Sequence, residues 1–80
     1  MCIKDAVAIR LQNILDERNI TIYQLAYDSG VTKSTIYSMV NAERKDVTLS
    51  TVKKLCDGLD ISITEFFTSQ EFYDLEQEIK

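Results

Sequence analysis

Residues 21–41 read TIYQLAYDSGVTKSTIYSMVN, and they contain the start and stop signals of two short helices. Thr21 has the side chain of a helix N-cap, and Gln24 three residues later completes the pattern of a capping box. The apolar side of the helix that follows is formed by Ile22, Leu25 and Ala26. Gly30 is expected to end it, because a sharp C-terminal turn needs a left-handed residue and glycine adopts that conformation cheaply.

A second short helix is predicted for residues 32–41. Thr32 is again an N-cap, and Ile36, Met39 and Val40 recur at the i, i+3, i+4 spacing of one buried side. The outward positions share short or polar hydrogen-bonding side chains and are Lys33, Ser34, Thr35, Tyr37, Ser38 and Asn41. A helix that enters the major groove of DNA needs such donors and acceptors and little negative charge. The stretch therefore has the layout of a DNA-reading helix-turn-helix.

The composition favours one small, nearly all-helical domain, since 80 residues contain 45% apolar residues, two glycines and no proline. No apolar run is long enough for a membrane span, and the N-terminus lacks a signal-peptide core. Cys2 and Cys56 lack metal-ligand spacing, so we expect reduced thiols in a cytoplasmic protein. Without histidine, a nucleophile–base pair or a phosphate-binding glycine loop, the sequence predicts no enzyme activity, metal, cofactor or small-molecule ligand.

The net charge of −4 is distributed unevenly along the chain. Residues 1–58 carry eight Lys/Arg and seven Asp/Glu, whereas residues 59–80 carry one Lys and six Asp/Glu. The part that contains residues 21–41 is thus close to neutral. It lacks the basic stripe of a tight, salt-sensitive DNA binder, which argues against high affinity as a monomer.

Three further helices are expected to complete the core. One should run from about Lys4 to Arg18, one from the cap Thr48 to near Gly58, and a short one from the capping box at Ser62. The apolar residues expected on their buried sides are Val7, Leu11, Ile14, Leu15, Leu49, Val52, Leu55, Cys56 and Leu59, with Phe66 or Phe67.

Residues 69–80 are predicted to form an additional helix that is amphipathic and acidic. Its apolar stripe is Phe72, Leu75 and Ile79, and its acids should keep it away from DNA phosphates. Three uses stay open: packing on its own domain, pairing with the same helix of a second subunit, or docking a different protein. The candidate dimer-interface residues are Phe67, Phe72, Leu75 and Ile79.

The polar loop that follows residue 41 contains the adjacent basic pair Arg44 and Lys45. It is either a solvated surface loop or, because it directly follows the presumed reading helix, a contact to DNA phosphates. Glu43 and Asp46 flank the pair and reduce the local positive field.

The order of these signals resembles the Cro/phage-repressor (XRE-type) helix-turn-helix family. The resemblance covers about Val7 to Phe67 and is strongest to small stand-alone regulators of Gram-positive bacteria and their mobile elements. The segments that carry it are QLA at 24–26, GVT at 30–32, STI at 34–36, TLSTV at 48–52 and LDISITEFF at 59–67. It implies an all-α, five-helix, lambda-repressor-like DNA-binding domain over residues 1–68, with the helix-turn-helix at 21–41 and the extra amphipathic C-terminal helix at 69–80.

The resemblance also implies that the helix at 32–41 lies in the major groove. Carried over from the family, the base-reading positions are Lys33, Ser34 and Ser38, and Lys33 would donate to guanine. The positions that would hold the DNA backbone are Thr21, Thr32, Thr35, Tyr37, Asn41, Arg44 and Lys45; the outward ring of Tyr37 has packing on the neighbouring loop as its alternative. Ile22 departs from the pattern, because many members have there a glutamine that grips a phosphate.

The sequence therefore predicts a sequence-specific transcriptional regulator, and in particular a repressor, that binds double-stranded DNA as a homodimer. Two reading helices in successive major grooves would recognise a pseudo-palindromic operator with half-sites about 34 Å apart. The second subunit would compensate for the thin basic surface. The alternative is a protein-interaction module, antitoxin-like or an anti-regulator, that has lost DNA binding; the acidic tail and Ile22 favour it.

Overall fold

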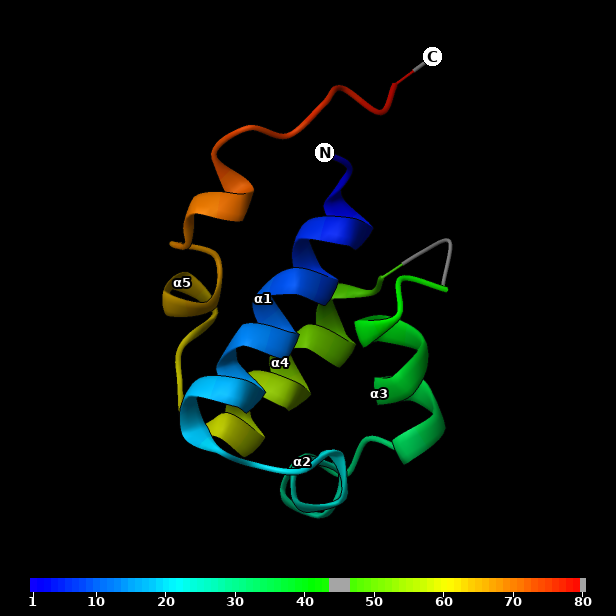
Figure 1. Cartoon of the computed structure of the whole chain (residues 1–80), viewed down its shortest axis with the longest axis vertical. Coiled ribbons are helices and arrows are strands. Elements are labelled where there is room, and N and C mark those ends of the chain that lie inside the picture. The colour runs from blue at the N-terminus through cyan, green and yellow to red at the C-terminus, as the bar shows by residue number, and fades with distance from the viewer. Residues whose placement is uncertain (44–46, 80) are drawn as a thin grey trace.

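Within residues 1–43 and 47–79, which the computed structural model describes, five α-helices follow one another. They are α1 (Ile3–Arg18), α2 (Ile22–Ser29), α3 (Lys33–Val40), α4 (Leu49–Leu59) and α5 (Ile63–Phe66), followed by a 3-10 turn, η1 (Gln70–Phe72). Figure 1 shows α1 in the middle, α3 and α5 on opposite sides of it, and α2 across one end. The predicted five-helix, all-α fold is confirmed. None of the described helices is long and apolar enough to cross a membrane.

Every helix contributes at least one buried side chain to a single core. Leu11, Leu25, Ile36, Leu55 and Phe66, one from each helix in order, are at most 1% exposed. Burying such a side chain contributes roughly 1.5–3 kcal/mol. Because helices of four to eleven residues are marginal alone in water, α2 to α5 depend on this shared core for their stability.

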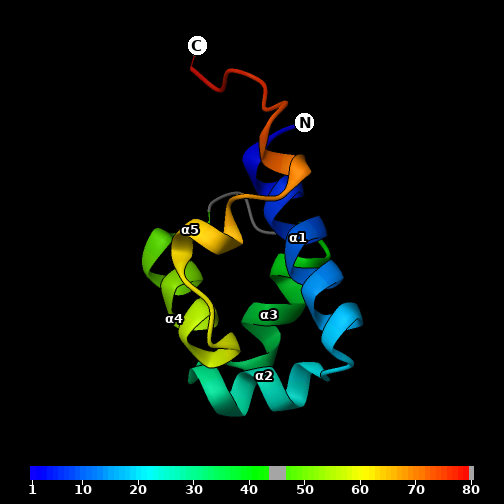
Figure 2. The ribbon, with the colours of Figure 1, turned by 90° about the vertical axis from the view of Figure 1, so that its left-hand side faces the viewer.

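Helix α2 packs directly against α4, and Figure 2 shows α2 lying across the end of the bundle. A Cβ atom added to Gly58 would stand 2.8 Å from the Cβ atom and 2.9 Å from the backbone nitrogen of Ser29. Real Cβ atoms do not approach other atoms so closely, and the backbone of Ser29 cannot move aside as a flexible side chain would. The glycine therefore lets the end of α2 rest directly on α4.

We expect Gly58→Ala to lower the free energy of unfolding by about 1–2 kcal/mol, measured by urea denaturation. Alanine gains up to about 1 kcal/mol in helix propensity, but the overpacking against Ser29 costs more. The matched control is Lys54→Ala on the exposed side of α4, which should change stability by less than about 0.5 kcal/mol. An alanine variant as stable as the wild type would contradict the close packing.

Two arginines of α1 hold the C-terminal ends of other helices. Arg10 donates from Nε to the carbonyl oxygen of Phe66 at 2.9 Å and from Nη2 to that of Glu65 at 3.0 Å. Arg18 donates from Nη1 to the carbonyl oxygen of Leu59, at the end of α4. Carbonyl groups at helix ends lack partners within the helix, so these cations satisfy them. Two of the chain's positive charges thus serve the fold.

Two details of the predicted helices are wrong. Leu49 is 63% exposed, not buried, because it is the first residue of α4 and precedes the turn that contacts the core. Gln24 does not return to the backbone of Thr21; its Nε2 donates to Oδ1 of Asp28 at 2.9 Å, one turn further along α2. Only the Thr21 half of that capping box is formed.

The predicted C-terminal helix is also wrong for the described residues. Only Gln70–Phe72 forms a helical turn, of the 3-10 type, and residues 73–79 continue without one. Phe72 packs against the domain, with its ring centroid 4.8 Å from that of Phe67. In a helix, Glu71 and Asp74 would be neighbours at i, i+3 and Asp74 and Glu78 at i, i+4. These like charges, with no lysine or arginine between them, would repel one another and destabilise the helix.

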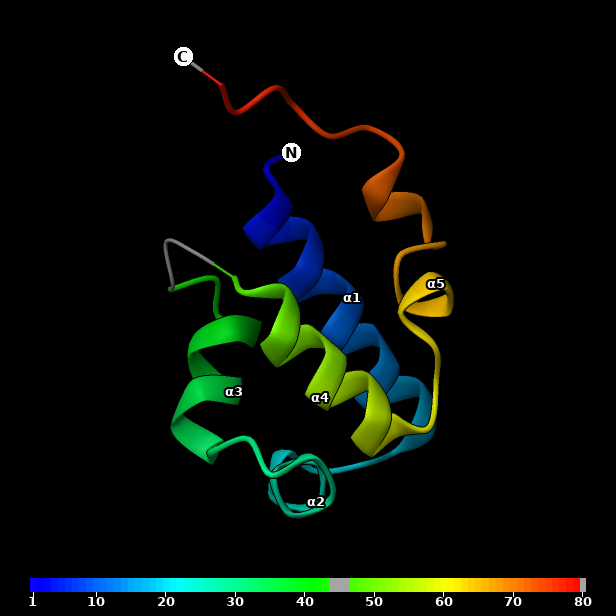
Figure 3. The ribbon, with the colours of Figure 1, turned by 180° about the vertical axis from the view of Figure 1, so that it is seen from behind.

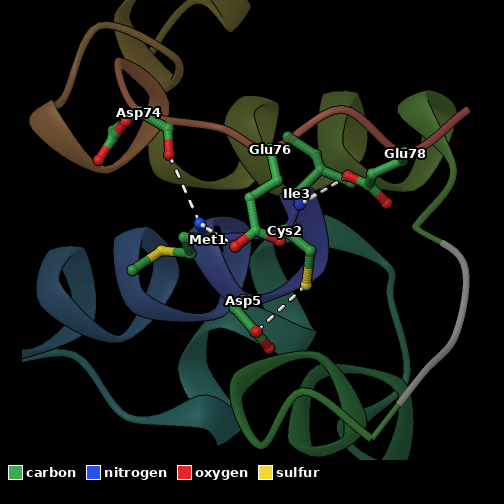
Figure 4. Close-up of polar contacts among 7 residues, drawn as sticks. All are labelled: Met1, Cys2, Ile3, Asp5, Asp74, Glu76 and Glu78. Carbon is green, nitrogen blue, oxygen red and sulfur yellow. Dashed lines mark hydrogen bonds and ion pairs between the residues drawn. The ribbon is translucent and has the colours of Figure 1, made fainter.

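The acidic tail instead wraps the start of α1 (Figure 4). The ammonium of Met1 lies 3.3 Å from Oε1 of Glu76, and the backbone N–H of Glu76 donates to the carbonyl of Met1 at 3.0 Å. The N–H of Ile3 donates to Oε2 of Glu78 at 2.9 Å, whereas Cys2 at the N-cap position offers no side-chain cap. The carboxylate of Glu78 therefore caps α1 from the other end of the chain.

We expect Glu78→Ala to speed amide hydrogen exchange at Ile3 about two- to fivefold, because the first turn of α1 loses an acceptor and a favourable negative charge. Exchange deeper in α1, for example at Leu11, should not change. Gln77→Ala is the control, since no described contact joins that neighbour to α1. Equal protection of Ile3 in both variants would show that Glu78 is not its partner.

Candidate nucleic-acid interface

The central motif consists of α2, the turn at residues 30–32, and α3. Oγ1 of Thr21 accepts the N–H of Gln24 at 3.1 Å, which starts α2. Gly30 ends that helix in the left-handed conformation, with φ of 74°. Val31 is then buried in the core, and its N–H donates to Oγ of Ser29 at 3.2 Å. The predicted helix, glycine turn and second cap are confirmed.

Helix α3 stands at the edge of the bundle, beside α1 and α2 (Figure 3). Oγ1 of Thr32 accepts the N–H of Thr35 at 3.3 Å, and the two hydroxyls lie 2.9 Å apart. Ile36 and Met39 are buried, as predicted. Of the outward positions, Lys33, Ser34, Tyr37 and Asn41 are exposed, and Thr35 and Ser38 are half-buried. The helix therefore presents its polar side to solvent.

The first turns of α2, α3 and α4 contain no acidic residue, and each follows a threonine cap. By contrast, α1 and α5 carry Asp5 and Glu65 in their first turns. A helix start has a partial positive charge and backbone N–H groups without helical partners, and an acid there would offset both. The positive ends of the two motif helices are thus left open to an anion such as phosphate.

Lys33, predicted to read bases, lies back over the neighbouring helix. Its Nζ is 3.8 Å from the centroid of the Tyr23 ring, which projects from the first turn of α2. Tyr23 is 65% exposed. The sequence pattern did not predict a role for Tyr23. Its place in the first turn of α2, ten residues before the lysine that starts α3, could have indicated that the two side chains meet.

The two serines predicted to read bases differ in what they can still donate. The hydroxyl of Ser38 donates to the carbonyl oxygen of Ser34 at 2.9 Å, a bond back to the preceding turn. Oγ of Ser34 lies 3.5 Å from Oγ1 of Thr32. While its bond to Ser34 is kept, Ser38 offers a partner only lone pairs, so it acts as an acceptor.

Of the other predicted DNA-backbone positions, Tyr37 lies in the second half of α3 and Asn41 is its C-cap residue. Arg44 and Lys45 fall outside the described residues. Just before them, Lys4 donates from Nζ to the carbonyl of Ala42 at 3.4 Å, which ties the start of α1 to the chain after α3. Ile22, in place of the family's glutamine, is half-buried against the core and supplies packing instead of a polar anchor.

The four predicted dimer-interface residues separate into two pairs. Phe67 and Phe72 are half-buried and pack against the core of their own domain. Leu75 and Ile79 are 39% and 84% exposed. The structure thus builds the first pair into the domain and leaves the second pair on the tail surface.

The sequence profile of the Cro/C1-type HTH DNA-binding domain matches residues 10–71, which include all of the motif. The chain belongs to this family of DNA-binding domains, which is a family of regulators and not of enzymes. Among curated proteins, no sequence is similar enough to count as a match.

Two solved structures share the fold closely. The wild-type restriction-modification controller protein C.Esp1396I is 25% identical, with a TM-score of 0.73 over 80% of this chain and 82% of that one. The prophage Lp1 protein 11 is 28% identical, with a TM-score of 0.78 over 94% of this chain and 100% of that one. This chain is therefore similar to a controller protein and to a prophage protein, over the whole length of the latter.

We expect Thr32→Asp to separate stability from DNA binding. Aspartate is as good an N-cap as threonine, so the free energy of unfolding should change by less than about 0.5 kcal/mol. Its charge at the start of α3 would repel phosphate, so affinity for a DNA duplex should fall at least about tenfold.

The matched control is Ser62→Asp, the same charge change at the cap of α5, which Figure 1 shows on the other side of the bundle from α3. It should retain most of the affinity, measured by fluorescence anisotropy. Equal losses in the two variants would mean that overall charge, and not the start of α3, determines binding.

Proposed function

We propose that the protein is a sequence-specific transcriptional repressor that binds a pseudo-palindromic DNA operator as a homodimer. The observation that carries the proposal is the start of α3, which presents hydroxyls and a lysine with no acid in its first turn. Membership of the Cro/C1-type family supports DNA binding, and the likeness to a restriction-modification controller protein supports a regulatory role. Such a protein acts where the chromosome is, in the cytoplasm of a bacterium.

Base recognition is assigned to the first positions and the middle of α3, namely Lys33, Ser34 and Ser38. As an acceptor, Ser38 suits the amino groups of adenine N6 or cytosine N4 in the major groove. Ser34 is exposed and can donate or accept, so it tolerates more kinds of base edge.

Contacts to the DNA backbone are assigned around these positions. They comprise the cap residues Thr21 and Thr32, the α3 residues Thr35, Tyr37 and Asn41, and the loop residues Arg44 and Lys45. Backbone contacts place the reading helix and supply affinity, but they carry no direct sequence information. The N–H groups at the start of α2 belong to the same set, because Ile22 supplies no polar group there.

Dimerisation is assigned to the exposed tail residues Leu75 and Ile79, supported from beneath by Phe67 and Phe72. A second subunit doubles the number of phosphate contacts, which a chain of net charge −4 needs more than a basic one. The competing function is a protein-interaction module without DNA binding, which the same acidic tail and the half-buried Ile22 favour.

Selection of bound sequences from a random duplex library tests these two functions. The regulator should enrich an inverted repeat with half-sites about 34 Å apart. Titration of the selected duplex across salt should then give a log–log slope of several units, about −0.9 per phosphate contact. Absence of enrichment at low salt and high protein concentration would exclude the regulator and favour the interaction module.

Two variants of the same assay separate base from backbone contacts. Ser34→Ala should change the preference among bases at one position of each half-site about two- to tenfold, because a single neutral hydrogen bond contributes about 0.5–1.5 kcal/mol. Arg44→Ala should lower the affinity for all DNA sequences by the same factor. It should also reduce the magnitude of the salt slope by about 0.9 per subunit. An unchanged slope for Arg44→Ala would remove that residue from the interface.

A further inference from the structure

We propose that Tyr23 is a positioning residue that holds Lys33 on the backbone side of the reading helix, where Lys33 neutralises a DNA phosphate instead of reading a guanine. The proposal rests on the DNA binding proposed above and changes the role of one residue in it. It also gives a role to Tyr23, which the sequence pattern left unassigned.

The contact between the two side chains is close and directional. The ammonium of Lys33 lies 3.8 Å from the ring centroid of Tyr23, well within the roughly 6 Å over which a cation is attracted to an aromatic face. Within the described residues, no carboxylate forms an ion pair with Lys33. Among the described residues, the contact that orients this ammonium is therefore the one with the Tyr23 ring.

The place of the ring decides which part of the duplex the ammonium meets. In helix-turn-helix proteins the second helix lies in the major groove, while the first helix crosses the sugar–phosphate backbone. Lys33 belongs to the second helix, α3, but its charge rests over a residue of the first helix, α2. This conformation directs the charge to the edge of the groove, away from the base edges at its floor.

The chemistry of lysine agrees with this placement. Its ammonium is a compact point charge that suits a phosphate oxygen, whereas the paired acceptors of guanine are best matched by the two-pronged guanidinium of arginine. Holding the flexible side chain in advance also reduces the entropy lost on binding. Tyr23 and Lys33 together thus provide a phosphate contact beside Ile22, where the family's glutamine is missing.

A first experiment tests the positioning without DNA. In the NMR spectrum of the wild-type protein, the ε-methylene protons of Lys33 should be shifted upfield by the ring current of Tyr23, with Lys33→Met identifying the signal. Tyr23→Leu should abolish the shift, and Tyr23→Phe should retain it because the aromatic face is kept. Tyr27→Leu, at the 85% exposed tyrosine one turn later in α2, is the matched control and should leave it unchanged. An unshifted wild-type signal would overturn the positioning role.

A second experiment tests the phosphate contact on the selected operator. Lys33→Met should reduce the magnitude of the salt slope by about 0.9 per bound subunit and leave the preferred bases unchanged. Tyr23→Leu should weaken binding about two- to fivefold for all sequences, the size of an exposed cation–π interaction, and Tyr23→Phe should restore affinity.

A changed base preference in Lys33→Met, with an unchanged salt slope, would overturn the phosphate role and return Lys33 to base reading. If the wild-type protein selects no duplex, the proposed DNA-binding function fails, and the phosphate role fails with it. The NMR result then still reports separately whether Tyr23 orients Lys33, so the two failures are distinguishable.

Discussion

The close packing of α2 on α4 fixes the position of the helix-turn-helix in the domain. Gly58 leaves no side chain between the two helices, so the end of α2 at Ser29 meets the backbone of α4 directly. One residue later, Gly30 turns the chain, and the buried side chain of Val31 anchors the turn to the core. The position of α2 therefore determines that of α3, because the connection between the two helices is too short to allow a different arrangement. A helix that presents functional side chains to solvent obtains its orientation from contacts on its buried side.

Much of this arrangement can be predicted from the sequence because it is local. The four polar caps Thr21, Thr32, Thr48 and Ser62 each accept the N–H three residues ahead, as their types indicate. A cap of this kind depends on neighbouring residues and backbone conformation alone. The buried stripes are predictable for a similar reason, since helical periodicity decides which residues share a side. Together, caps and stripes determine the five helices and the outward side of α3.

The features that sequence reasoning missed depend on distant residues. The residue that caps α1 is Glu78, 75 positions away from Ile3, and a pattern read along the chain does not connect them. The apolar spacing of residues 69–80 suggested a helix, but contacts of Glu76 and Glu78 with the start of α1 accompany a non-helical course. The pairing of Lys33 with Tyr23 likewise arises only once α2 and α3 are packed. Leu49 has the right period but lies one turn too early to reach the core.

The course of the tail beside the start of α1 also concentrates negative charge at that end of the molecule. The segment 70–79, which contains Glu71, Asp74, Glu76 and Glu78, lies toward one end of a body 37 Å long, and α2 lies at the other end (Figure 1). Near a polyanion such a molecule experiences a torque that turns its acidic end outward before any contact forms. At physiological ionic strength the field decays over about 8 Å, so this alignment acts in the last stage of approach and weakens as salt is added. If the start of α3 faces the duplex as proposed, the acidic tail increases the fraction of encounters that begin with α3 toward the DNA.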